Sequence, residues 1–530
     1  MKSATLFGTL ACALLLGQAS ITAIFAQPST DSATKPIATT STGQVSGGLL
    51  YDGVAFFKNI PFAQPPVGDL RWREPLPAKA WSGVRDATAF GPACVQSGHL
   101  NATSSEDCLQ LNIWTPSWPV KSPVPVILWY HGGGNTAGSA IEPLFNGETF
   151  ARHGVILVSA NYRLGVFGFF AHPELTKESA HHSSGNYALL DQIMAIQWVH
   201  DNISKFGGDP ANVTIIGESA GSMDVNTLLT TPASKGLFAR AIAESGAAGD
   251  AQSLADAEKK GEALAAKLNI AGDGSLAKLR AVSTDDLLKA STPAPGGGGG
   301  GAMLGIDVDG WVLPESPAKA FAAGHEHKVA ILFGNNSQEL QRPFSGAATD
   351  LRGAISKYFG PLSDRALAAY SLSGTTDPQP DPEFGNVGAQ WATDSTFRCA
   401  TVQELSWHTA AGNPAYEYQF SISVHGKESE GAPHASEIPF VFGTLSVWQK
   451  MRGYTLADRQ YAPVVQEYWV NFAKTGDPNG PGLVKWPTFD PSGRGYIDFT
   501  DAGPVAKAGL RKPVCDVFMD NQKRLWAAAQ

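Results

Sequence analysis

The stretch Gly217-Glu218-Ser219-Ala220-Gly221 decides the fold, because it places a serine between a strand pattern and a helix pattern. The residues before it, Val213-Thr214-Ile215-Ile216, form a β-branched run typical of a buried strand. A sharp strand-to-helix turn projects a serine hydroxyl above a sheet, and flanking glycines leave room for the strained backbone. The chain contains 57 glycines, so this short pattern needs support from other parts of the sequence.

A glycine-rich turn provides that support. Val124–Tyr130 reads as a buried strand and runs directly into His131-Gly132-Gly133-Gly134. The backbone amides of Gly133 and Gly134, together with that of Ala220, are candidates to bind an oxygen that becomes negative during attack on an ester. A turn of purely steric origin is the alternative. The two motifs in this order favour a site for acyl transfer.

Four further segments of the sequence are informative: Asn59–Pro75, Ser105–Trp114, Asn161–Gly165 and Phe206–Pro210. With these segments and the two motifs above, the chain resembles the type-B carboxylesterases, the branch of the α/β-hydrolase superfamily that includes the cholinesterases. The resemblance extends from about Gly43 to Cys515.

The resemblance implies an α/β-hydrolase fold, an α/β architecture with a large, mostly parallel, twisted central sheet flanked by helices. A small N-terminal β-hairpin region is expected between Gly43 and Phe57. Residues 43–530 are then one catalytic domain, which follows a signal peptide at 1–26 and a disordered leader at 27–42. Helices are expected at Tyr187–Ser204 and Asp458–Lys474, the second with its start shifted later by Pro463.

The same resemblance nominates the other members of a catalytic triad around Ser219. Glu339 closes a Gly-x-Asn-x-x-Glu pattern after the strand pattern Val329–Phe333. His434 lies in a Gly-x-x-His segment followed by Glu437-Ile-Pro-Phe-Val-Phe-Gly443. A serine hydroxyl needs an imidazole to accept its proton, and a buried carboxylate fixes the tautomer of that imidazole.

Alternatives exist for these assignments. Glu339 has the alternative of an ordinary exposed loop glutamate. His425 is the main competitor of His434 as the base, whereas His131 is expected to shape the glycine turn. Four mature cysteines also raise the alternative of a zinc site, but they contain no Cys-x-x-Cys pair, and we expect no metal and no cofactor.

Supporting roles follow from the resemblance for several polar residues. Ser245 is expected beneath the site, either as a hydrogen-bonding partner or as a turn former, and Glu218 is expected to support the serine. The resemblance also implies two ion pairs, Arg71 with Glu106 and Arg163 with Asp191.

Cysteine usage bears on the compartment. Without Cys12 in the leader, four cysteines remain, and spacing alone allows three pairings. The resemblance selects Cys94 with Cys108 and, by default, Cys399 with Cys515. Two disulfides agree with secretion or a periplasmic location.

The N-terminus and the composition agree with export. Lys2 precedes a short apolar run, Leu6–Gly17, and small residues lead to a cleavage site after Ala26; an uncleaved anchor is the alternative. No other run is long enough to span a membrane. The formal net charge of −9 speaks against nucleic acid as a partner.

The sequence therefore predicts a secreted serine hydrolase that cleaves small carboxylic esters through an acyl-enzyme. An acyltransferase or amidase with the same triad and a non-catalytic binding protein of the same fold remain alternatives. The glycine run Gly296–Gly301 has two interpretations, a solvated connector and a mobile flap over the acyl pocket.

Overall fold

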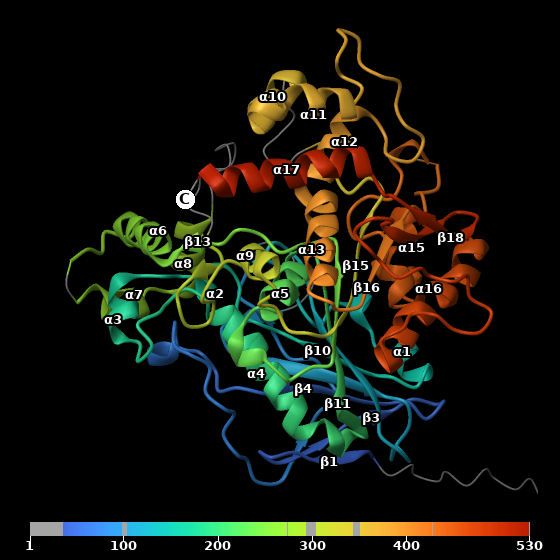
Figure 1. Cartoon of the computed structure of the whole chain (residues 1–530). Helices are drawn as coiled ribbons and strands as arrows, with labels where there is room; N and C mark the ends of the chain where they lie inside the picture. The colour runs from blue at the N-terminus through green and yellow to red at the C-terminus, as the bar shows by residue number, and fades with distance from the viewer. Residues whose placement is uncertain are drawn as a thin grey trace, which may run out of the picture. The chain divides into compact units, whose positions relative to one another are not determined.

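A large mixed sheet forms the centre of the structure (Figure 1), which is a computed structural model that describes residues 35–97, 103–272, 274–292, 304–342, 350–426 and 428–528. The sheet has 11 strands in the spatial order β18-β17-β16-β15-β12-β11-β9-β10-β8-β4-β3. Residues from Lys35 onward cluster into one compact unit. In chain order, these strands are β3 (Gly48–Leu49), β4 (Ala55–Pro61), β8 (Gln110–Thr115), β9 (Val124–Tyr130), β10 (Ile156–Ala160), β11 (Gly208–Glu218), β12 (Arg240–Glu244), β15 (Ala330–Asn336), β16 (Ala415–Phe420), β17 (Gly495–Thr500) and β18 (Gly503–Ala508).

The middle of the sheet is parallel and its edges are antiparallel. Strands β10, β9, β11, β12, β15, β16 and β17 pair in parallel with their neighbours. At one edge β8, β4 and β3 run antiparallel, and at the other edge β18 does so. The parallel strands are buried on both faces, which explains why their sequences are nearly continuous apolar runs.

Strand β9 shows how the two faces are filled. Val126 and Leu128 belong to one buried cluster, whereas Ile127 and Trp129 belong to another, because successive side chains of a strand point to opposite faces. Helices α4, α5 and α13 contribute apolar side chains to the first cluster. Helices α1 and α16 contribute to the second. The helices therefore cover the sheet from both sides.

The helices have the following bounds: α1 (Glu148–Arg152), α2 (Gly165–Gly168), α3 (Pro173–Glu178), α4 (Tyr187–Asn202), α5 (Ala220–Leu228), α6 (Leu254–Lys267), α7 (Ser275–Ala281), α8 (Thr284–Ser291), α9 (Pro317–Ala323), α10 (Leu351–Phe359), α11 (Ser363–Ala369), α12 (Val387–Thr393), α13 (Cys399–Ala410), α14 (Ile438–Val441), α15 (Leu445–Arg452), α16 (Leu456–Thr475) and α17 (Lys512–Ala528). None of the helices among the described residues is both long and apolar enough to cross a bilayer.

The N-terminal region differs from the expected disordered leader at 27–42. Ile37–Thr39 forms β1, which pairs antiparallel with β2 (Gln44–Ser46), and β2 pairs with β5 (Val84–Asp86). The pairing is stabilised because Ala38 and Val45 are both buried. The expected hairpin is present as β3 and β4. The signal peptide at 1–26 and the glycine run at 296–301 lie outside the described residues.

Helix α16 corrects the expectation that Pro463 delays the helix start. The helix begins at Leu456, and Pro463 lies inside it. The start is fixed by a capping box, in which the side chains of Thr455 and Asp458 each accept a hydrogen bond from the backbone amide of the other residue. Pro463 is exposed, so its ring projects to the surface.

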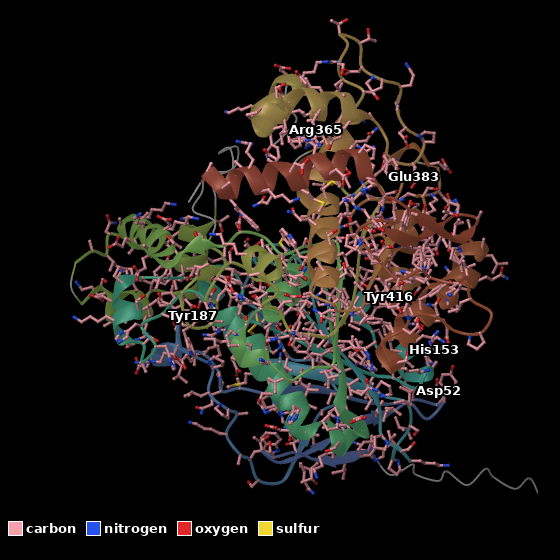
Figure 2. All side chains as sticks on the ribbon, viewed as in Figure 1. Asp52, His153, Tyr187, Arg365, Glu383 and Tyr416 are labelled. Atoms are coloured by element: carbon pink, nitrogen blue, oxygen red, sulfur yellow. A yellow bond between two sulfur atoms is a disulfide. The ribbon has the colours of Figure 1, made fainter. Side chains whose placement is uncertain are left out.

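Two disulfides connect distant parts of the chain. Cys94, at the end of β6 (Ala93–Cys94), bonds Cys108, close to β7 (Ser104–Ser105). Cys399, the first residue of α13, bonds Cys515 in α17, and its yellow bond lies between these helices in Figure 2. Both pairings are those that the resemblance implied.

Candidate active site

Ser219 occupies the turn between β11 and α5. Its φ of 56° and ψ of −120° are unusual for a residue with a side chain, and its backbone amide donates to the carbonyl oxygen of Glu244 at 2.9 Å. The second glycine of the motif, Gly221, lies against the backbone of Tyr130. A side chain is not accommodated there, because a Cβ on Gly221 would lie 2.2 Å from the carbonyl oxygen of Tyr130. The backbone therefore holds the serine in a strained turn at the N-terminus of a helix.

The glycine turn lies beside Ser219 because β9 and β11 are neighbours in the sheet. A Cβ on Gly132 would lie only 2.9 Å from the Cβ of Ser219. Gly133 and Gly134 have φ values of 107° and 65°, which glycine adopts without strain. Within the described part of the chain, neither of their amides donates to a protein acceptor. Both amides are thus available to an oxygen of a ligand.

Glu339 and His434 form a direct hydrogen bond. The loop after β15 carries Glu339, and His434 lies in the segment before α14. The distance from His434 Nδ1 to Glu339 Oε2 is 2.6 Å, and the backbone amide of His434 donates to the carbonyl oxygen of Glu339 at 3.1 Å. Glu339 is buried, so this carboxylate can fix the orientation and the tautomer of the imidazole.

The other ring nitrogen of His434 faces the serine turn. His434 Nε2 lies 3.2 Å from Glu218 Oε1, and Glu218 directly precedes Ser219. Phe397 stacks on the imidazole with 4.9 Å between ring centroids. The structure thus brings Glu339, His434 and the residue next to Ser219 together, although the ring nitrogen contacts Glu218 in this arrangement. By contrast, His425 binds Asp458 through its Nε2 and lies outside this group of contacts.

The other carboxylate oxygen of Glu339 accepts two hydrogen bonds. Ser245 Oγ donates to Glu339 Oε1 at 2.6 Å, and the backbone amide of Asn336 donates to the same oxygen at 2.7 Å. The buried Arg398 donates to the carbonyl oxygen of Ser337 at 2.6 Å and pairs with Asp394. This guanidinium fixes the loop that carries the glutamate.

Four buried glutamates surround this region and influence one another: Glu218, Glu244, Glu339 and Glu437. Burial raises the pKa of Glu218 to about 8 and that of Glu437 to about 7. Burial also raises the pKa of Glu244 well above its usual value. For His434, burial favours the neutral form, but the nearby Glu218 and Glu339 outweigh it and raise the pKa to about 10. The site therefore favours a protonated imidazole.

Two further residues connect the glycine turn to the serine helix. Asn135 Nδ2 donates to Asp224 Oδ1 at 2.8 Å, and Gln192 Nε2 donates to Asp224 Oδ2 at 2.7 Å. Asn135 follows the glycine turn, and Asp224 lies on α5. The sequence contained no signal that these two side chains contact each other.

Sequence reasoning also missed the roles of Glu437 and Asn336. Asn336 Nδ2 donates to Glu437 Oε2 at 2.6 Å, and Ser245 Oγ lies 3.5 Å from Glu437 Oε1. Glu437 lies in the segment used to find His434, so its acidic character next to the histidine was the available signal.

The expected ion pairs are formed away from the serine. Arg71 pairs with Glu106 at 2.5 Å, and Arg163 pairs with Asp191 at 2.7 Å. Arg163 and Asp191 are both buried, and this pair connects the segment after β10 to helix α4. Arg71 is buried, and Glu106 is half-buried. Among the described residues, no group of three or more histidine, cysteine, aspartate or glutamate side chains is placed to hold a metal ion.

The sheet order and the serine turn define a protein of the α/β-hydrolase fold. The profile of the Carboxylesterase family matches residues 34–518. The fumonisin B1 esterase of Sphingopyxis macrogoltabida is 36% identical over 479 residues, 86% of this chain and 84% of that protein. The para-nitrobenzyl esterase of Bacillus subtilis (strain 168) is 37% identical over 480 residues, 86% of this chain and 93% of that protein.

A solved structure agrees with these relatives. The structure of a PNB esterase matches with a TM-score of 0.78 and 34% identity, covering 91% of this chain and 100% of that chain. The chain belongs to the carboxylesterase family, and it is a carboxylic-ester hydrolase.

Proposed function

We propose that the chain is an exported serine esterase in which Ser219, His434 and Glu339 act as a catalytic triad. The contact of 2.6 Å between His434 Nδ1 and Glu339 Oε2 carries this proposal, because it turns Nε2 toward the serine turn. Ser219 lies on a strained turn of the type that exposes a nucleophile.

In the proposed mechanism, Ser219 Oγ attacks the carbonyl carbon of the ester, and His434 Nε2 accepts its proton. This transfer requires that Nε2 first contacts Ser219 Oγ in place of Glu218. The amides of Gly133, Gly134 and Ala220 bind the oxygen that becomes negative. His434 next gives the proton to the departing alcohol, which leaves an acyl group on Ser219. A water molecule, deprotonated by His434, attacks the carbonyl carbon of this acyl-enzyme. The bond to Ser219 Oγ then breaks, the proton on His434 passes to Ser219 Oγ, and the acid leaves.

Export is the second part of the proposal. The apolar N-terminal run supports it, as do the two disulfides, which persist in oxidising compartments. Expression of the full chain in a bacterial host, followed by N-terminal sequencing of the periplasmic or secreted protein, tests it. We expect a mature N-terminus near Gln27. An active protein in the cytoplasm that retains Met1 would refute export.

The names of the relatives suggest which small esters to test. We propose that the chain accepts para-nitrobenzyl esters, since a relative of 37% identity is named for them. Hydrolysis of para-nitrobenzyl acetate, compared with a panel that varies in acyl length, measures this preference directly. No turnover of any benzyl ester, together with turnover of other esters, would contradict it.

The nucleophile is tested by replacement and by labelling. We expect Ser219→Ala to lower kcat by about 10⁴-fold or more and to prevent labelling by a fluorophosphonate, because both need the hydroxyl. Ser446→Ala is the matched control, since Ser446 is exposed on α15. Peptide mass spectrometry locates the label. A label on another serine, or full turnover by the Ser219 variant, would contradict the assignment.

A further inference from the structure

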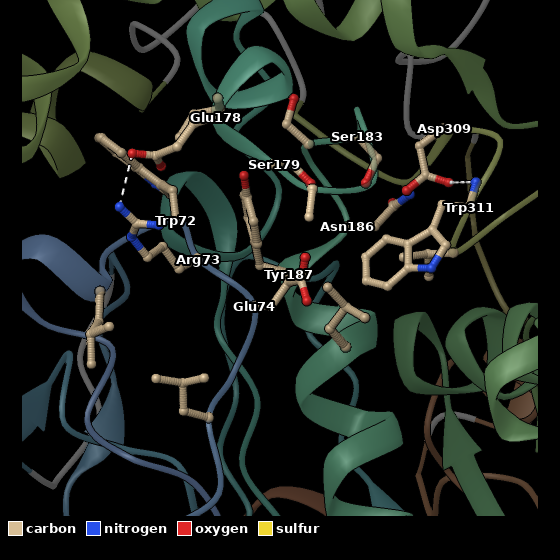
Figure 3. A pocket seen from close by; sticks show the side chains of 17 residues that line it. Trp72, Arg73, Glu74, Glu178, Ser179, Ser183, Asn186, Tyr187, Asp309 and Trp311 are labelled. Carbon is tan, nitrogen blue, oxygen red and sulfur yellow. Dashed lines mark hydrogen bonds and ion pairs between the residues drawn. The ribbon is translucent and has the colours of Figure 1, made fainter.

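A cavity of about 420 Å³ opens beside the start of α4, and Figure 3 shows it from close by. We call it the side pocket. Its volume lies in the range typical of small-molecule sites. Its lining includes Leu70, Trp72, Glu74, Tyr187, Asp309 and Trp311.

The side pocket is distinct from the proposed ester site. Among the described residues that line it, none is Ser219, Glu339 or His434, and none belongs to the glycine turn. It lies instead next to a third apolar cluster, which α2, α3, α6, α7 and α8 build with Trp72 and Tyr187. An occupant of the side pocket therefore lies against other residues than those of the proposed triad and glycine turn.

Aromatic rings line the side pocket. Trp72 and Tyr187 are buried lining residues, and the indole N–H of Trp72 donates to the carbonyl oxygen of Val166 at 2.8 Å. Trp311 stacks on His181 with 3.7 Å between ring centroids and 4° between planes, which fixes its ring at the pocket. The faces of such rings bind apolar groups and attract cations.

A carboxylate with a free oxygen lies at one end. Asp309 is 9% exposed, and its Oδ1 accepts hydrogen bonds from the amides of Trp311 and Leu313. Its Oδ2 is buried and has no hydrogen-bond partner among the described residues. Figure 3 shows Asp309 and Trp311 together at the same side of the pocket. A buried, unpaired carboxylate oxygen is costly unless something binds it.

The surroundings of Asp309 contain a second carboxyl group without a partner. Asp307 is fully buried, and neither of its carboxyl oxygens has a partner among the described residues. Burial raises the pKa of Asp307 to about 8, with repulsion from Asp309 and Glu258 as further causes. At neutral pH Asp307 is therefore mostly protonated, and Asp309 is the acceptor that the pocket offers to a cation.

The one cation among the described lining residues is already paired. Arg73 binds Glu178 at 2.8 Å, and Arg280 binds the other oxygen of Glu178 at 2.6 Å. Glu74, which also lines the pocket, lies 3.8 Å from His181 Nε2. An anionic ligand would therefore meet carboxylates without a free cation, whereas a cation would meet the unpaired Oδ2 of Asp309.

We propose that the side pocket binds an organic ammonium ion with an apolar or aromatic body. The ammonium group contacts Asp309 Oδ2, and the body packs against Trp72, Tyr187 and Trp311. The net charge of −9 of the chain favours the approach of such a cation.

Calorimetric titration with 2-phenylethylammonium chloride and with the neutral 2-phenylethanol tests the proposal. We expect the ammonium ion to bind at least tenfold more tightly than the alcohol. Asp309→Asn should remove most of this preference, because asparagine keeps an oxygen for the amides of Trp311 and Leu313 but loses the charge. Trp311→Ala should weaken both probes.

The matched control is Asp490→Asn, since Asp490 is an exposed aspartate that also accepts from two backbone amides of its turn. This control should bind both probes like the original protein. Turnover of para-nitrophenyl acetate, unchanged in the aspartate variants, verifies folding, and Glu74→Gln replaces Asp309→Asn if that variant fails to fold. Equal binding of the two probes, or an ammonium affinity unchanged in Asp309→Asn and Trp311→Ala, would overturn the proposal.

Discussion

The amide of Asn135 donates to the carboxylate of Asp224 across 2.8 Å, and this bond joins the glycine turn after β9 to the helix that follows Ser219. The segment that carries the proposed oxyanion donors is thereby tied to the helix that begins directly after the proposed nucleophile. Gln192 completes the arrangement by binding the second oxygen of Asp224.

Replacement of Asn135 measures how much this hydrogen bond contributes to the free energy of unfolding. Asn135→Gly removes the amide without strain, because φ at this position is 56° and glycine adopts such values freely. We expect a loss of about 1–3 kcal/mol in the free energy of unfolding, since Asp224 loses one of its two donors, together with a lower kcat. Asn135→Ala should cost about 1–2 kcal/mol more from backbone strain. Urea unfolding measures both, and equal stability of Asn135→Gly and the original protein would contradict the role.

The protonation of Asp224 makes stability depend on pH. Burial raises the pKa of Asp224 to about 7 in the folded protein, against about 3.9 in an unfolded chain. Between these values the folded protein holds a proton that the unfolded chain has lost. This contribution to the free energy of unfolding therefore decreases as the pH rises from about 4 to about 7, and it is constant above that range.

Asp224→Asn removes this titration. The difference in unfolding free energy between the original protein and the variant should change by roughly 2–4 kcal/mol from pH 4.5 to pH 7.5. Over this range the original protein becomes less stable relative to the variant. Asn135 and Gln192 can turn their amides to serve the new side chain, because each has a buried carbonyl oxygen without a partner among the described residues. Parallel stability profiles of the two proteins would disprove the raised pKa.

The pH dependence of catalysis tests the contact between Glu218 and His434. In the proposed mechanism His434 must be neutral to accept a proton, and Glu218 favours its charged form. Glu218→Gln should therefore lower the pKa of His434 and move the acidic limb of kcat/KM to lower pH by about 1–3 units. The same profile for Glu428→Gln, an exposed glutamate, is the control. An unmoved limb in Glu218→Gln would show that this contact does not set the pKa.

The two disulfides should contribute unequally to stability. Cys399–Cys515 closes a sequence separation of 116 residues, and Cys94–Cys108 closes one of 14. Loop entropy predicts that loss of the longer link costs about 2 kcal/mol more. Serine replacements at both members of each pair, compared by urea unfolding, measure this difference. A greater loss from the shorter link would contradict the entropy argument.

Much of the sheet was predictable because its parallel strands are continuous apolar runs. The strand expected at Val124–Tyr130 has those bounds, and the helix expected at Tyr187–Ser204 ends at Asn202 before a short 3₁₀ turn. The start of α16 was not predicted, since the capping box at Thr455 decides it rather than Pro463. Local patterns therefore predict elements better than their ends.

Site residues that lie within a recognisable sequence motif could be nominated from the sequence. Site residues that are defined only by a contact between distant segments could not. Glu339 and His434 were nominated from separate segments, and their direct bond is a property of the fold. The contact of Glu218 with His434 and the bond between Asn135 and Asp224 join segments far apart in the sequence. The same holds for the side pocket, whose walls come from helices α3 and α4 and from several loops.

The link between Cys399 and Cys515 has a consequence for the redox conditions of folding. Cys399 follows Arg398, whose guanidinium binds the loop before Glu339, and its partner lies on α17. This covalent tie forms only where an oxidant is present. Under reducing conditions the helix that carries Arg398 therefore loses one of its anchors, although the residues of the proposed triad contain no sulfur.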